Sequence, residues 1–153
     1  MGWTCAALAM SNVGPDRHTL FIRVGAACVF LGLLAITCAI GRAPLLDVAA
    51  SAALMGCGFG LSWSFMGTRI LEGLPDEERG LGAGAIPTVQ MIGAAVGAAG
   101  ASALGDVLGL ADGMTRLTAL KAAPLLFAAF LPLSALGWIS AHRLAGLGPA
   151  AKT

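Results

Sequence analysis

Two uncharged side chains inside apolar stretches are the residues of this sequence best suited to binding a ligand. The first is Trp63, which shares one helix face with three glycines because the set is spaced by four, three and four residues: Gly56, Gly60, Trp63 and Gly67. A flat indole beside the space left by glycines can stack on an apolar or cationic ligand. The same ring can instead fill a gap between helices, or belong to the aromatic belt at a membrane interface.

The second candidate is Gln90, which precedes Gly97 by seven residues and so shares its helix face. An amide in hydrocarbon is costly unless it is hydrogen-bonded, so this side chain must face protein or a wet cavity. A substrate contact and an interhelical hydrogen bond both satisfy that requirement. Thr88 follows Pro87, and we expect its hydroxyl to bond backbone groups that the proline leaves open.

Other kinds of chemistry lack the residues they need. Ionisable groups within a membrane usually mark proton and ion pathways, but here Asp47, Arg69 and Asp106 stand at the ends of uncharged runs. His18 and His142 adjoin arginines at such ends, and we expect them at the level of the lipid headgroups. The cysteines lie in apolar runs without a CxxC pair: Cys5, Cys28, Cys38 and Cys57. We therefore expect no catalytic residue, no metal, no cofactor and no enzymatic activity.

The composition is that of a membrane protein. Hydrophobic residues make up 58% and charged residues 11% of the chain, against about 45–50% and 25% in soluble domains. The mean hydropathy is +0.86. The net charge of +1 argues against a nucleic-acid partner. Because the charges cluster between long neutral runs, the sequence predicts an all-α polytopic protein of the lipid bilayer.

The neutral runs predict one membrane domain, residues 1–153, with four transmembrane helices. The spans are expected at about 20–41, 48–70, 82–105 and 122–142. Residues 1–15 fall short of the roughly 20 needed to cross a bilayer and lack the basic start of a signal peptide. They indicate either the remnant of a preceding helix or a short interfacial segment.

Glycines on the second and third spans predict tight helix packing. Gly93, Gly97 and Gly100 share one face of the third span, and Gly56 and Gly60 share one face of the second. Membrane helices associate by close van der Waals contact, which small residues permit. These five positions are therefore the predicted helix-packing residues.

The basic residues predict an orientation. Short connections make neighbouring spans antiparallel, so the basic residues divide between two sides of the membrane. One side carries Arg42, Arg116 and Lys121, and the other carries Arg17, Arg23, Arg69, Arg79, Arg143 and Lys152. The richer side is expected to be cytoplasmic. This places the C-terminus and the charged hinge at 74–79, LPDEER, inside the cell.

One long stretch resembles a known family. Residues 56–100, GCGFGLSWSFMGTRILEGLPDEERGLGAGAIPTVQMIGAAVGAAG, resemble helices ten and eleven of major facilitator superfamily transporters in the drug:proton antiporter group. In that family a glycine-rich helix is followed by a short cytoplasmic P-x-E-x-x-G loop and then a helix with small residues and G-x-x-x-G. Residues 17–41 resemble helix nine with its preceding loop, 122–143 resemble helix twelve, and 2–12 resemble the end of helix eight.

The resemblance implies part of a C-terminal transporter half. Such transporters have 12 or 14 spans in two halves, with the substrate site between them near the midplane. The second span would line the cavity, the third would pack between the halves, and the first and fourth would face lipid. The implied function is export of small apolar or cationic compounds, coupled to protons, across a bacterial-type inner membrane. The missing N-terminal half would be its partner, and the isolated fragment is expected to be inactive.

Two alternatives belong to other functional classes. One is a small oligomeric four-helix multidrug carrier, although those carriers have a membrane glutamate in the first helix that this chain lacks. The other is a non-transporting membrane interaction protein whose glycine faces dock on a partner.

Overall fold

The computed structural model describes residues 18–41, 45–110, 113 and 115–146, and every regular element within them is an α-helix. In chain order these are α2 (His18–Ala39), α3 (Leu45–Glu72), α4 (Arg79–Val107), α5 (Arg116–Ala129) and α6 (Leu131–Gly146). No strand occurs in this described part of the chain. The all-α prediction is confirmed.

Four helical stretches are long and apolar enough to cross a membrane: α2, α3, α4 and the joined run Arg116–Gly146. This number agrees with the predicted transmembrane helices. Their bounds differ from the expected spans by up to six residues, and at most ends the helical backbone continues through charged residues beyond the neutral run. Residues 1–15, interpreted above as a helix remnant or an interfacial segment, lie outside the described residues.

The predicted fourth span is one rod built from two helices. The break falls at Phe130, whose backbone N–H donates to the Phe127 carbonyl at 3.1 Å rather than to the carbonyl four residues back. Pro132, two residues later, has no N–H to donate to the preceding turn. The helix resumes at once, because the Ser134 N–H donates to the Phe130 carbonyl at 3.0 Å.

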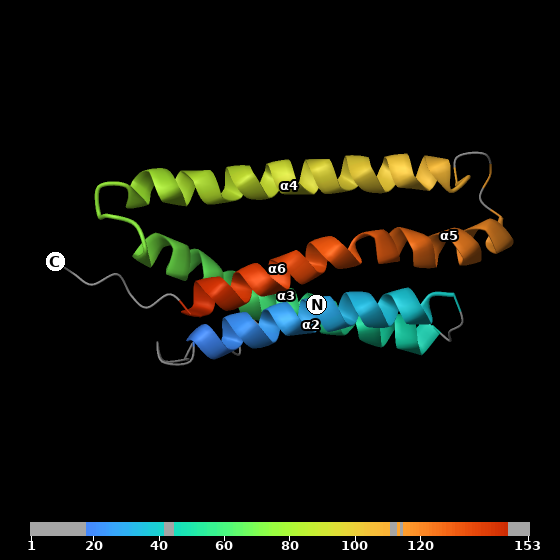
Figure 1. Cartoon of the computed structure of the whole chain (residues 1–153), viewed down its shortest axis with the longest axis horizontal. Helices are drawn as coiled ribbons and strands as arrows, with labels where there is room; N and C mark the ends of the chain where they lie inside the picture. Colours follow the sequence, from blue (N-terminus) through green and yellow to red (C-terminus); the bar gives the residue numbers. More distant parts are fainter. Residues whose placement is uncertain (1–17, 42–44, 111–112, 114, 147–153) are drawn as a thin grey trace.

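The packed part of the molecule consists of α2, α3 and α6. Helix α2 has its most extensive contacts with α3 and its next most extensive with α6, and the three lie together in Figure 1. The buried residues that join them are Ile22, Phe65, Ala141 and Ala145, with Phe21, Ala26 and Met66 packed around them. This core therefore lies at the end of the bundle where α2 begins and α6 finishes.

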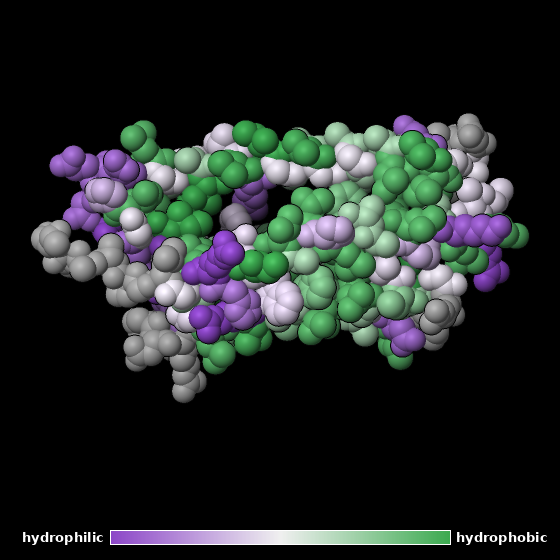
Figure 2. Space-filling model, in the orientation of Figure 1, coloured by the Kyte–Doolittle hydropathy of each residue, from purple (hydrophilic) through white to green (hydrophobic). Residues whose placement is uncertain are grey.

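Helix α4 lies apart from this core. Figure 1 shows it running alongside the other helices, and it has only limited contacts with α3 and α5. No residue of its most apolar window is buried. An opening separates the first half of α4 from the rest of the molecule in Figure 2. Most of the α4 surface is consequently available to lipid or to another helix.

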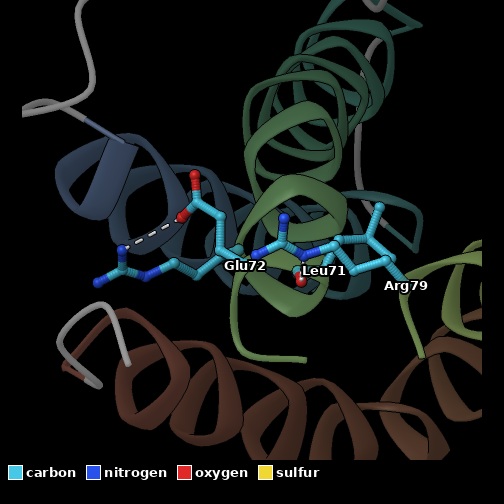
Figure 3. Close-up of polar contacts among 4 residues, drawn as sticks. Leu71, Glu72 and Arg79 are labelled. Carbon is cyan, nitrogen blue, oxygen red and sulfur yellow. Dashed lines mark hydrogen bonds and ion pairs between the residues drawn. The ribbon is translucent and has the colours of Figure 1, made fainter. Parts of the chain in front are cut away.

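The hinge between α3 and α4 is an ordered turn (Figure 3). The Arg79 Nε donates to the Leu71 carbonyl at 3.2 Å, which also accepts from the Leu74 N–H at 3.2 Å just beyond the end of α3. Its Nη1 also pairs with Asp76 at 2.7 Å. The Leu74 side chain packs where a Cβ at Gly82 would lie, so glycine at this position allows the turn to close tightly. The start of α4 is thereby tied to the end of α3.

The turn between α4 and α5 is set by local signals. Gly109, with φ of +76°, ends α4 in the left-handed region. Its N–H donates to the Asp106 carbonyl, and the Leu110 N–H donates to the Gly105 carbonyl, both at 3.0 Å. This pair of bonds is a Schellman motif. Thr115 then caps α5, because its side chain accepts a hydrogen bond from the Thr118 N–H.

Candidate functional site

Helices α2 and α3 approach closely at glycines that are not among the predicted helix-packing residues. A Cβ at Gly25 of α2 would lie 2.6 Å from the Gly58 carbonyl oxygen, and a Cβ at Gly58 would lie 2.6 Å from the Gly25 carbonyl oxygen. A Cβ at Gly32 would lie 2.8 Å from the Met55 backbone nitrogen. The seven-residue spacing of Gly25 and Gly32, which puts them on one helix face, is the sequence signal for this contact.

The predicted glycine stripe of α3 flanks this contact. The residues that meet α2 include Met55, Gly58 and Ser62. Gly56 and Trp63 each follow one of them by one residue, which is about 100° around a helix, and Gly60 is two residues from its nearest contact residues. Gly60 is buried. Gly56 and Gly67 have no neighbouring atom within 4 Å of a Cβ position. The space that these two glycines leave is therefore open.

Trp63 lies half-buried on this flank. Its ring stacks on Phe59, one turn earlier, with centroids 5.7 Å apart and planes 8° from parallel. The side chain of Phe59 is itself 41% exposed. The two rings form a broad apolar surface with open glycine positions beside it. Such a surface can stack on a flat apolar or cationic molecule. The substrate contact predicted for Trp63 stays a prediction.

Gln90 and the glycine face of α4 are open. Gln90 is exposed, and nothing lies within 4 Å of a Cβ position at Gly93, Gly97 or Gly100. The described chain does not itself supply the helix that this face is expected to approach, so its packing role also stays a prediction. Trp63 lies on α3 and Gln90 on α4, and these two helices have few contacts with each other.

The Thr88 hydroxyl does not bond the carbonyl that Pro87 leaves open. The carbonyl that loses its partner at Pro87 is that of Ala83, four residues earlier. The Thr88 hydroxyl donates instead to the next carbonyl, that of Gly84, at 3.1 Å. Its bond is the common i−4 bond of a hydroxyl within a helix, and the same bond is made by Ser62 to Gly58 at 2.9 Å.

A groove on α6 holds aromatic, aliphatic and basic side chains together. Its volume is about 390 Å³, and it is lined by Trp138, Ile139, His142 and Arg143. Trp138 stacks on Phe30 of α2, with centroids 5.4 Å apart. The His142 ring meets the edge of Trp138 at 5.6 Å and 81°. The position of His142 at the headgroup level stays a prediction, and no sequence signal indicated a role for Trp138, one helical turn earlier.

The ionisable groups named from the sequence occur at helix ends. Asp47 lies in the first turn of α3 and Arg69 in its last turn, and Asp106 is the next-to-last residue of α4. Within the described residues, no three His, Cys, Asp or Glu side chains are grouped so that they could hold a metal ion. Comparison of the chain with protein-family models, curated proteins and solved structures finds no match.

Proposed function

We propose that this chain is part of a major-facilitator-type secondary transporter that exports small apolar or cationic compounds. The observation that carries the proposal is the position of α4, a glycine-rich helix tied to α3 by the charged hinge yet outside the α2–α3–α6 core. Its uncharged open face is suited to close packing against further helices. That arrangement agrees with a helix placed between the two halves of such a transporter.

The proposed substrate contacts are on α3 and α4. A planar apolar or cationic compound would stack on Trp63, in the space beside Gly56 and Gly67. The exposed amide of Gln90 would offer a hydrogen bond from the neighbouring helix. Alternating access requires two halves that move about a central site. We therefore propose that the missing half supplies the opposite wall and the acidic residues for proton coupling.

The test of this proposal is reconstitution. Purified chain in liposomes with an imposed pH gradient is expected to show no saturable uptake of a fluorescent cationic dye, because alternating access needs two halves that move about the site. Dye movement is expected when the preceding helices are supplied on a second chain or in a longer protein. Trp63→Ala should then reduce the movement, whereas Ala95→Gly, a small change on α4 away from the proposed contacts, should not.

Two results would contradict the proposal. Saturable, gradient-driven movement by the chain alone, lost in Trp63→Ala, would favour the small oligomeric carrier. No movement in any combination, with stable association of the chain with another membrane protein, would favour the non-transporting interaction protein.

The proposed location is a bacterial-type inner membrane with the C-terminus in the cytoplasm. This is testable by labelling intact cells with an impermeant thiol reagent, after replacement of the four native cysteines. Cys at Glu77, in the hinge, and Cys at Thr153, which is outside the described residues, should be protected. Cys at Gly113, between α4 and α5, should be labelled. Labelling at Glu77 from outside would reverse the orientation.

A further inference from the structure

We infer that the groove on α6 binds the phosphate headgroup of an anionic phospholipid, with one acyl chain lying along the outer face of the helix. The inference is independent of the transport function proposed above. It is based on the lining of the groove, on two arginines that pair with no carboxylate among the described residues, and on the exposed apolar side chains that lead away from them along α6.

The groove combines a polar end with an apolar wall. His142 and Arg143 are both exposed, and they lie in the last turns of α6. Trp138 and Ile139 come one turn earlier and are 36% and 48% exposed. Stacking on Phe30 fixes the indole as one wall of the groove. A ligand that fills it must therefore offer a polar group to the end of the helix and an apolar group to the membrane side.

The cations at this end favour an anion. Arg69 and Arg79 pair with Glu72 and Asp76, whereas no ion pair joins Arg143 to another described residue. Arg23 of α2 reaches the same end, because its Nη2 lies 3.8 Å from the Cβ position of Gly146. The Arg23 Nε is buried and has no hydrogen-bond partner within the described chain. Guanidinium groups form strong, charge-assisted hydrogen bonds with phosphate and carboxylate oxygens.

The exposed apolar side chains along α6 favour a lipid over a soluble phosphate. Leu136, Ile139 and Arg143 are spaced by three and four residues, so they share one face of α6. Leu136 is 63% exposed. A phospholipid on this face would cover Ile139 and Leu136 with an acyl chain while its headgroup binds Arg143. A soluble phosphate would leave Ile139 and Leu136 exposed. Basic side chains at the end of a membrane helix attract anionic lipids in the same way.

Trp138 is the reporter for the experiment. In a Trp3→Phe/Trp63→Phe chain in bilayers, its fluorescence is quenched by lipids brominated on their acyl chains. We expect phosphatidylglycerol to be preferred over phosphatidylcholine, and Arg143→Gln to reduce the preference about fivefold, given the usual attraction of one arginine to an anionic surface. Arg143 is exposed, so the variant is expected to fold. Arg116→Gln, at the opposite end of the same membrane span, is the charge-matched control and should leave the preference unchanged.

Three results would overturn the inference. The first is equal quenching by the two lipids. The second is an unchanged preference in Arg143→Gln, or an equal loss in Arg116→Gln. The third is full competition by inorganic phosphate or glycerol phosphate, which would indicate a soluble phosphate ligand. The Arg23→Gln variant tests whether the headgroup lies between α2 and α6. A reduced preference for phosphatidylglycerol would support that position, and an unchanged preference would contradict it.

Discussion

Replacing Gly58 by alanine is expected to lower the free energy of unfolding by about 1–3 kcal/mol, the usual cost of overpacking a tight contact. The added Cβ would lie 2.6 Å from the Gly25 carbonyl oxygen, 2.7 Å from the Cys28 Cβ and 2.7 Å from the Val29 nitrogen. Two of these atoms are backbone and none can rotate away. Helices α2 and α3 must therefore separate, which weakens the most extensive contact in the described fold.

Gly97→Ala is the matched control. It makes the same chemical change in a helix, but nothing lies within 4 Å of the Cβ position at Gly97. Alanine favours helix over glycine by about 1 kcal/mol, so this variant should be neutral or slightly stabilised. The measurement is thermal unfolding of the purified chain in detergent. A Gly58→Ala protein as stable as Gly97→Ala would mean that α2 and α3 do not approach through these glycines.

The helices themselves could be predicted because their signals are local. Long uncharged runs predicted four membrane-crossing stretches, and the described chain has four. The bounds were less accurate, since a helix does not end where charge begins. Arg116 and Lys121 both lie within α5, although hydropathy alone suggested that the fourth span starts after them. Gly109 and Thr115 are the residues that set the actual turn, through backbone and capping bonds.

The contacts between helices could not be predicted in the same way. In a membrane, a face that meets lipid and a face that meets another helix are both apolar, so hydropathy does not separate them. Gly58 and Gly60 are only two residues apart, and the register between α2 and α3 determines that Gly58 meets Gly25. The groove on α6 depends on a similar long-range contact, because Phe30 of α2 supports Trp138.

Leucine at Gly97 is expected to have opposite consequences in two settings. In the isolated chain, the open face of α4 can accept the side chain, so the unfolding temperature should not fall. In the complete two-half transporter proposed above, we expect the same change to abolish dye efflux. The glycine face would be packed there, and a leucine would hold the neighbouring helix away. Gly93→Leu, one turn earlier, should behave in the same way.

Ala95→Leu is the control for both settings, because Ala95 occupies a different face of α4. It should retain most of the efflux and leave the isolated chain unchanged. Co-purification of the two parts gives a readout besides activity, and it should be lost with Gly97→Leu and retained with Ala95→Leu. Efflux that survives leucine at both Gly93 and Gly97 would mean that this face meets lipid in the complete protein. A fall in the stability of the isolated Gly97→Leu chain would mean that a second copy of the chain already covers α4.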